Sequence, residues 1–86
     1  MNIYELTARF DSRKSFYHKA LVQVDGNVQT LLSYETPVAK IENGKLALLS
    51  AWDYSSTTRR HVKEFIRQNG MEEQFNALVG GTKKVD

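Results

Sequence analysis

The segment Val38-Ala-Lys-Ile-Glu-Asn-Gly-Lys-Leu-Ala-Leu-Leu49 carries the strongest hairpin signal in the chain. Asn43-Gly44 at its centre readily adopts the positive φ angles of a two-residue type I′ turn, and alternating apolar residues flank it. A turn of this length would set Ile41 opposite Leu46. The segment therefore predicts two antiparallel strands.

A second hairpin is predicted upstream, around Asp25-Gly26-Asn27. Residues 16–24 alternate β-branched and aromatic residues with a period of two, as a half-buried strand does. A three-residue loop would pair Val22 with Thr30 and gather most apolar residues on one face, whereas a two-residue loop would mix them with Ser33. The pattern therefore favours the three-residue loop.

Pro37 lies inside the run that follows this loop. Proline cannot donate a ladder hydrogen bond, and the apolar residues change parity after it, so we expect a one-residue β-bulge near Thr36-Pro37. Residues 28–42 then form one bulged strand of a three-stranded antiparallel meander. Residues 1–14 add either a fourth strand or an irregular arm.

The second half of the chain predicts helices. Ser55-Ser-Thr-Thr58 supplies capping hydroxyls, residues 59–68 are good helix formers, and Gly70 follows the predicted end. A short second helix is expected over residues 71–79. The predicted fold is therefore α+β, with a three- or four-stranded antiparallel meander packed against one main helix and a short C-terminal helix.

One face of the main helix is apolar. Val62, Phe65 and Ile66 fall together on a helical wheel, and we expect this face to pack on the sheet with Phe65 in the core. His61 lies at the border of the same face. The position favours a packed, hydrogen-bonded histidine with a structural role.

The 86-residue chain has room for one modest hydrophobic core, which makes a large enclosed active site unfavourable. Hydrophobic residues make up 41% and charged residues 26%, the balance of a globular domain. We expect one domain over residues 1–79 and a flexible tail over residues 80–86. There is no cysteine, no apolar run typical of a signal peptide and none near the roughly 18 residues of a membrane span. We therefore expect a cytoplasmic protein with no membrane partner.

The formal net charge is only +2, but basic residues concentrate in residues 9–19 and 59–67. In the predicted helix they form a stripe opposite the apolar face. Such a stripe attracts phosphates or an acidic protein surface, and it is also the charged exterior that a small domain needs. The candidate binding residues are Arg59, Arg60, Lys63, Arg67, Arg9, Arg13 and Lys14. Stacking contacts with bases would come from Tyr17, Trp52 or Tyr54.

No residue pattern predicts a catalytic or metal centre. The two histidines, His18 and His61, lack the spacing typical of metal ligands. A nucleophile among residues 55–58 beside His61 would lack elbow glycines and an orienting carboxylate, so helix capping is the better interpretation of these hydroxyls. We expect no cofactor and no enzymatic activity.

Three segments, Ala8 to Ala20, Ser33 to Ala39 and Asp53 to Gln68, resemble a known protein family. The third contains a Tyr-Ser-x-Thr-Thr-x-Arg-His-x-x-Glu-Phe-x-x-Gln segment, formed by Tyr54, Ser55, Thr57, Thr58, Arg60, His61, Glu64, Phe65 and Gln68. The family comprises small uncharacterised proteins of bacteriophages and conjugative elements of Gram-positive bacteria. The resemblance implies a setting in which small accessory proteins bind nucleic acid or inhibit host proteins.

The leading hypothesis is a non-enzymatic accessory protein of a mobile element that docks on a host protein and inhibits a nucleic-acid-processing defence enzyme. The alternative is direct, weakly sequence-specific binding of nucleic acid through the basic stripe. A small hydrolase or nuclease is the least favoured interpretation. The sequence leaves the choice between a protein and a nucleic-acid partner open.

Overall fold

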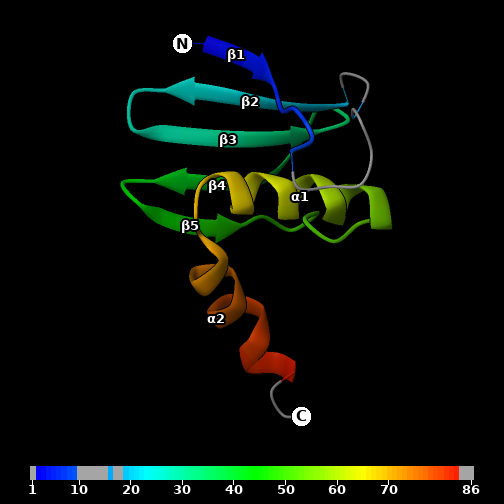
Figure 1. The fold of residues 1–86 in the computed structure, drawn as a ribbon, viewed down its shortest axis with the longest axis vertical. Coiled ribbons are helices and arrows are strands. Elements are labelled where there is room, and N and C mark those ends of the chain that lie inside the picture. Colours follow the sequence, from blue (N-terminus) through cyan, green and yellow to red (C-terminus); the bar gives the residue numbers. More distant parts are fainter. Residues whose placement is uncertain (1, 10–15, 17–18, 84–86) are drawn as a thin grey trace.

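Three two-residue turns fold residues 20–48 into an antiparallel meander, and an N-terminal strand extends one edge of it (Figure 1). The protein is described by a computed structural model that covers residues 2–9, 16 and 19–83. In both sequence and spatial order, the strands are β1 (Asn2–Glu5), β2 (Ala20–Asp25), β3 (Val28–Ser33), β4 (Thr36–Glu42) and β5 (Lys45–Leu48). The helices α1 (Ser56–Gln68) and α2 (Glu72–Lys83) follow. The fold class is α+β, as predicted, with five strands in place of three or four.

The first tight turn is shorter than the sequence pattern predicts. Gly26-Asn27 alone connects β2 to β3, with the glycine at φ 62°. Val22 consequently lies opposite Leu31 and not opposite Thr30, so the predicted three-residue loop is wrong. The shorter turn puts Ser33 on the core face, which is tolerated because its hydroxyl finds hydrogen-bond partners there.

A turn at Tyr34-Glu35 divides the single strand expected over residues 28–42 into β3 and β4. Both residues have positive φ, 52° and 70°, as a type I′ turn requires. Residues other than glycine, asparagine and aspartate seldom adopt this left-handed conformation, which costs about 1 kcal/mol each. The dipeptide therefore gives no turn signal in the sequence. By contrast, the turn at Asn43-Gly44 forms as predicted and sets Ile41 opposite Leu46.

The expected β-bulge lies in β4, beside Pro37. Leu31 pairs with Ala39 and Leu32 pairs with Pro37, so Val38 is the extra residue of the bulged strand. Because of this shift, Val38 and Ala39 are both buried, although neighbouring residues of a regular strand point to opposite faces. The prediction of a bulge near this proline is confirmed.

The N-terminal residues form both of the structures expected for them, a strand and an irregular arm. β1 pairs antiparallel with β2 and forms one edge of the sheet. Residues 6–9 then leave the sheet, and the Leu6 side chain turns into the core. The Leu6 N–H remains bonded to the Ala20 carbonyl at 2.9 Å, which anchors the start of the arm.

The two ends of α1 are closed by local residues. At its start, the Ser55 side chain accepts a hydrogen bond from the Thr58 N–H at 3.1 Å, which confirms the predicted cap. At its end, Gly70 has φ 66°, and the Met71 N–H reaches back to the Ile66 carbonyl at 3.0 Å. This closure is a Schellman motif, in which glycine supplies the left-handed residue.

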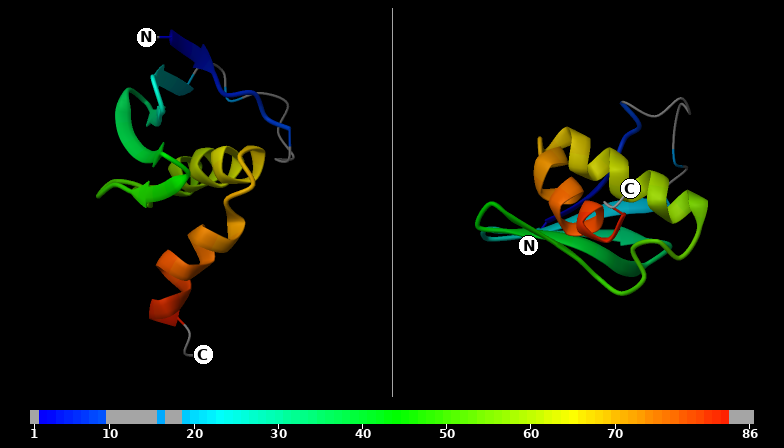
Figure 2. Two further views of the ribbon diagram at one scale, coloured as in Figure 1. Left: turned by 90° about the vertical axis from the view of Figure 1, so that its left-hand side faces the viewer. Right: turned by 90° about the horizontal axis from the view of Figure 1, so that it is seen from below.

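α1 lies across one face of the sheet and completes a two-layer core (Figures 1 and 2). Its predicted apolar face is confirmed, since Val62, Phe65 and Ile66 are at most 2% exposed. The remaining core side chains come from the sheet, from the N-terminal arm and from one residue four positions before β2: Leu6, Phe16, Ala20, Val22, Leu31, Val38, Ala39, Ile41 and Leu46.

α2 is attached to the β5 edge by its first turns and then projects away from the sheet (Figure 2). Gln74 Oε1 accepts a hydrogen bond from the Leu46 N–H, and Gln74 Nε2 donates to the Gly44 carbonyl, both at 2.9 Å. The Phe75 ring packs edge-on against Trp52 with the centroids 5.6 Å apart. A side-chain amide thus occupies backbone groups that an edge strand would otherwise present to another chain.

The C-terminal helix is longer than predicted. It continues past Val79, through both glycines at 80 and 81, to Lys83. The last residues of the expected flexible tail, 84–86, lie outside the described residues.

Replacing Phe65 with alanine is expected to lower the free energy of unfolding by about 3–5 kcal/mol, because the ring is fully buried between helix and sheet. Leu78→Ala is the matched control, since this side chain is 49% exposed on α2 and its loss should cost less than about 1 kcal/mol. Urea denaturation followed by circular dichroism measures both. A loss below about 1 kcal/mol for Phe65→Ala would contradict its place in the core.

Replacing Glu35 with glycine is expected to raise the free energy of unfolding by up to about 1 kcal/mol, because glycine adopts φ 70° without the steric cost of a Cβ. Glu42→Gly is the control, because Glu42 lies in β4, where glycine should lower stability by about 0.5–1 kcal/mol. The same denaturation experiment compares the two. A destabilised Glu35→Gly variant would contradict the strain at this turn.

Candidate functional site

A row of polar side chains is buried between the start of α1 and the end of β3. Ser33 Oγ lies 2.8 Å from His61 Nδ1 and 3.4 Å from Thr58 Oγ1. Ser55 Oγ donates to the same Thr58 oxygen at 3.1 Å. Ser33, Thr58 and His61 are at most 3% exposed, so these bonds join helix and sheet away from bulk water.

A hydroxyl at 2.8 Å from an imidazole is also the pairing in which a histidine activates a nucleophile. Here the imidazole packs against two aromatic rings, with centroid distances of 4.6 Å to Phe16 and 5.8 Å to Tyr34. Ser33 and His61 are both buried, which leaves little of either group for a substrate to contact. The geometry agrees with the expected packed, hydrogen-bonded His61, and the pair serves to hold α1 on the sheet.

Glu64 is a further buried polar residue of α1, and the sequence names it only as a member of the segment shared with the resembling family. Its side chain is 2% exposed, and Oε2 accepts hydrogen bonds from the Arg9 backbone N–H at 2.8 Å and from Gln68 Nε2. Gln68 also donates to the Thr7 carbonyl at 2.6 Å. These bonds fasten the arm after β1 to the flank of α1.

These contacts give a structural role to most of the Tyr-Ser-x-Thr-Thr-x-Arg-His-x-x-Glu-Phe-x-x-Gln segment. Spacings of three and four residues bring its members to one side of a helix. The members that face the sheet or the arm are Ser55, Thr58, His61, Glu64, Phe65 and Gln68. Tyr54 differs from them because its side chain is 83% exposed and makes no comparable contact with the core.

The predicted stripe of cations lies on the face of α1 that points away from the sheet. Arg59, Lys63 and Arg67 are exposed and follow one another at four-residue spacing, so they span about 12 Å of helix. We call these three residues the basic stripe. Within the described ranges none of them forms an ion pair, and Arg59 Nη1 only reaches the Asp53 carbonyl at 3.5 Å. The three charges are therefore open to a partner.

The other predicted binding residues are not part of this stripe. Arg60 is half-buried on α1 and takes part in an interaction of its own. The Arg9 backbone is held against Glu64, which puts the exposed Arg9 side chain at the flank of the helix. Arg13 and Lys14 lie outside the described residues.

Of the three aromatic residues expected to stack on bases, the structure describes two, Trp52 and Tyr54. Trp52 is half-buried and its ring packs against Phe75. Tyr54 is open to solvent at the start of α1, and Tyr17 lies outside the described residues. Of the rings that the structure describes, Tyr54 is therefore the better placed for an external contact.

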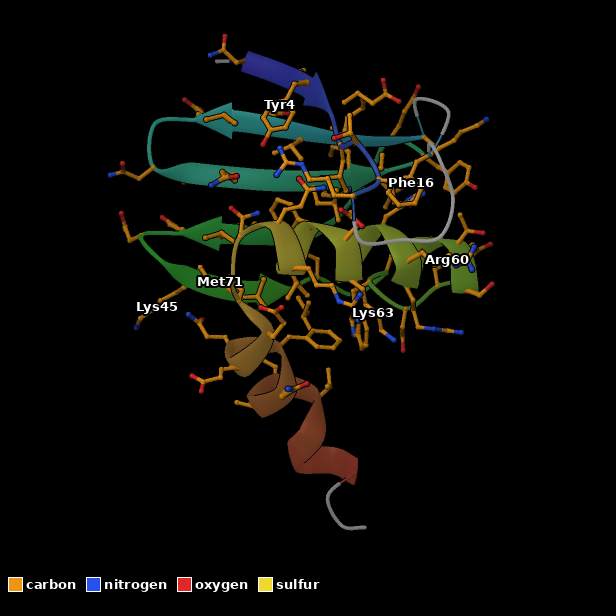
Figure 3. All side chains as sticks on the ribbon, viewed as in Figure 1. Tyr4, Phe16, Lys45, Arg60, Lys63 and Met71 are labelled. Carbon is orange, nitrogen blue, oxygen red and sulfur yellow. The ribbon has the colours of Figure 1, made fainter. Side chains whose placement is uncertain are left out.

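Beside the basic stripe, α1 and α2 border a groove of about 290 Å³. Ile66 and Phe75 give it an apolar floor, Lys63 and Arg67 form one rim, and Glu72 and Asn76 form the other. In Figure 3, Lys63 projects from α1 on the side on which α2 lies. We call this the interhelical groove. An apolar centre with a polar, charged rim is typical of protein interfaces.

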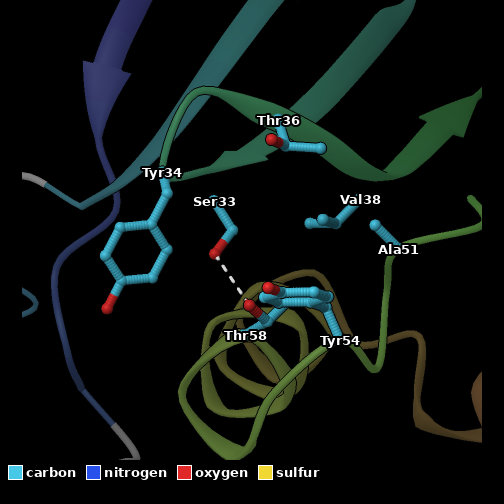
Figure 4. A pocket seen from close by; sticks show the side chains of 7 residues that line it. All are labelled: Ser33, Tyr34, Thr36, Val38, Ala51, Tyr54 and Thr58. Atoms are coloured by element: carbon cyan, nitrogen blue, oxygen red, sulfur yellow. Dashed lines mark hydrogen bonds between the residues drawn. The ribbon is translucent and has the colours of Figure 1, made fainter.

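A cavity of about 370 Å³ opens at the other end of α1, between the β3–β4 turn and the first turn of the helix (Figure 4). We call it the tyrosine pocket, because its lining includes the exposed rings of Tyr34 and Tyr54, at 51% and 83%. Its lining residues are Ser33, Tyr34, Thr36, Val38, Ala51, Tyr54 and Thr58. None of the seven carries a charge. The sequence pattern did not predict this cavity, because its walls come from two separate stretches of the chain, residues 33–38 and 51–58.

Metal-ligand clusters and membrane-spanning helices are both absent from residues 2–9, 16 and 19–83. No three histidine, aspartate or glutamate side chains of these ranges gather as metal ligands do. No helix of the same residues is both long and apolar enough to cross a bilayer.

The architecture defines a small α+β domain in which one main helix packs on a five-stranded antiparallel meander. Residues 4–80 match a family of unknown function, DUF8033, and the chain belongs to this family. The match covers nearly the whole sheet, all of α1 and most of α2. No curated protein and no solved structure matches the chain.

Replacing Ser33 with alanine is expected to lower the free energy of unfolding by about 1–3 kcal/mol, because the buried His61 and Thr58 lose a hydrogen-bond partner. Ser56→Ala, at an exposed position in the first turn of α1, is the control and should change stability by less than about 0.5 kcal/mol. Urea denaturation compares the variants. Equal effects of the two substitutions would show that the Ser33 hydroxyl does not hold the helix on the sheet.

Proposed function

We propose that the protein is a non-enzymatic binding protein that docks on an acidic surface of a host protein through the basic stripe. The observation that most supports this is the exposure of Arg59, Lys63 and Arg67 without an ion pair in the ranges that the structure describes. A partner that presents carboxylates to these side chains would form charge-assisted hydrogen bonds, each worth about 1.5–3 kcal/mol. Three such bonds over two turns of one rigid helix suffice for specific docking.

The interhelical groove favours a protein partner over a nucleic acid. The half-buried Phe75 in its lining offers an apolar contact that a phosphate backbone would leave unused. Glu72 on the far rim and the neighbouring Glu73 would repel phosphates. Direct, weakly sequence-specific binding of nucleic acid remains the alternative function, supported by the same stripe of cations.

The likeness of residues 54–68 to proteins of bacteriophages and conjugative elements supports a role as an accessory protein of a mobile element. In that setting, we infer that the partner is a nucleic-acid-processing defence enzyme and that docking inhibits it. The stripe would be repelled by the basic groove in which such an enzyme holds nucleic acid. Docking would therefore take place on acidic surface, either at catalytic carboxylates or outside the nucleic-acid groove.

The test compares the protein with a variant in which Arg59, Lys63 and Arg67 are all glutamine. Each form is immobilised and exposed to nuclease-treated lysate of a Gram-positive host, and the captured protein is then purified and titrated. The variant should keep its fold, because exposed substitutions usually change stability by less than about 0.5 kcal/mol each. Its affinity for the partner should fall at least about tenfold, because charged hydrogen bonds are lost.

The control replaces Lys40 and Lys45 with glutamine, which removes positive charge from residues of β4 and β5 that belong to neither the basic stripe nor the lining around Tyr34 and Tyr54. It should bind the partner as the unmodified protein does. Unchanged binding by the stripe variant, or equal weakening by both variants, would contradict the proposed docking surface. Capture that requires nucleic acid, with steeply salt-dependent binding to labelled DNA or RNA, would favour the alternative function.

A further inference from the structure

We propose that the tyrosine pocket receives an aromatic side chain, tyrosine or tryptophan, of the protein whose acidic surface lies on the basic stripe. The inference rests on the proposed function and adds to it the chemical class of the residue that anchors the partner.

The lining of the pocket fits an uncharged ring that carries one hydrogen-bonding group. Val38 and Ala51 provide an apolar wall, and the exposed Thr36 brings a hydroxyl group to the same space (Figure 4). The hydroxyls of Ser33 and Thr58 are already bonded to each other within the fold. An ionised ligand would lose its hydration here without meeting an opposite charge. A phenol or an indole instead buries its ring and has a single O–H or N–H to bond.

The size of the cavity is sufficient for one ring system. At about 370 Å³ it lies near the lower end of the range for small-ligand pockets, roughly 300–1,000 Å³. A side chain from a docked protein is of this size, whereas an extended ligand would leave most of its surface outside. Tyrosine and tryptophan in central pockets are also the residues that contribute most to protein interfaces.

The backbone is strained where the pocket opens. Tyr34 and Glu35 hold positive φ angles, whereas Asn43-Gly44 forms the equivalent turn of the next hairpin from residues suited to it. The strained turn carries Tyr34 at the mouth, half exposed, with its ring tilted at 38° to that of His61. Strain of this kind is retained mainly at binding or catalytic regions, so it supports a ligand at this mouth.

The charges that the described residues bring to the mouth balance one another. Lys19 Nζ lies 5.6 Å from the centroid of the Tyr34 ring, and the Arg59 side chain reaches the Asp53 carbonyl next to Tyr54. The exposed carboxylates of Glu35 and Asp53 adjoin the same two tyrosines in sequence. The phosphate of a nucleotide would therefore gain no net attraction, and this favours an aromatic side chain over a nucleobase.

The pocket and the basic stripe meet at the first turn of α1. Arg59 belongs to the stripe, and its guanidinium approaches the residue directly before Tyr54, which lines the pocket. A partner whose acidic residues lie along the stripe thus reaches the pocket within about one helical turn. One docked surface can therefore contact both sites.

The test is a two-dimensional ¹H–¹⁵N NMR titration with N-acetyl-L-tryptophanamide and N-acetyl-L-tyrosinamide. Both should shift the signals of Tyr34, Tyr54 and Thr58, with dissociation constants on the order of 1–10 mM. N-acetyl-L-leucinamide and adenosine 5′-monophosphate are the comparison ligands and should bind at least about fivefold more weakly. Absence of shifts with the aromatic amides, or equal binding of the aliphatic amide or the nucleotide, overturns the proposal.

Two variants test whether the aromatic amides bind in the tyrosine pocket. Tyr54→Ala removes an exposed ring from the mouth, and Ala51→Leu fills the cavity. Each substitution should lower the affinity for the aromatic amides at least about fivefold. Tyr4→Ala is the matched control, because this ring is 49% exposed on β1 and does not line the pocket. If the Ala51→Leu variant does not show the native NMR spectrum, the affinity of the Tyr54→Ala variant alone tests whether the amides bind in the pocket. A natively folded Tyr54→Ala variant that binds as tightly as the unmodified protein overturns the proposal.

The proposal for the pocket and the proposal for the basic stripe can be contradicted separately. The triple glutamine variant of the basic stripe should bind the aromatic amides normally, because Arg59, Lys63 and Arg67 do not line the pocket. With the captured partner, a loss of affinity in Tyr54→Ala but not in the stripe variant would reject the stripe and support the pocket. A loss in the stripe variant alone would reject the pocket as an anchor.

Discussion

The hydrogen bonds that Ser33 makes with α1 are the constraint on which the rest of the structure depends. A serine on the core face of a sheet is unfavourable unless its hydroxyl is bonded, and Thr58 and His61 provide those bonds. They fix the rotation of α1 about its own axis. With His61 turned inward, the apolar residues beside it enter the core, and the stripe that begins at Arg59 must face solvent.

The same helix also gathers segments that are distant in sequence. Glu64 and Gln68 bind the arm after β1, while the first turn of α1 binds the end of β3. The partners in these bonds are 25 to 61 positions apart along the chain. Because α1 is held at both ends, its outer surface is a rigid platform, which reduces the conformational entropy that docking would cost.

Buried residues that stabilise the fold and the exposed residues of the basic stripe alternate along one helix of 13 residues. The inward residues satisfy every polar group they bury, and no buried side-chain nitrogen or oxygen in the described part of the chain lacks a hydrogen bond. The residues of the basic stripe are exposed and do not take part in these buried hydrogen bonds. The exposed cations of the basic stripe, which form no ion pair with any residue that the structure describes, and the strained turn at Tyr34 are the features that folding alone does not require.

The sequence alone determined the features that depend on near neighbours: the Asn43-Gly44 turn, the bulge beside Pro37, the caps and apolar face of α1, and the stripe opposite that face. Each follows from residues within a few positions of one another, where local geometry and periodicity decide. Only the tertiary structure decided the turn at Tyr34-Glu35, the register that buries Ser33, the burial of Glu64 and the tyrosine pocket. A polar side chain is buried in a core only where another group forms a hydrogen bond with it. Here the hydrogen-bonding groups come from segments that the local sequence pattern does not connect.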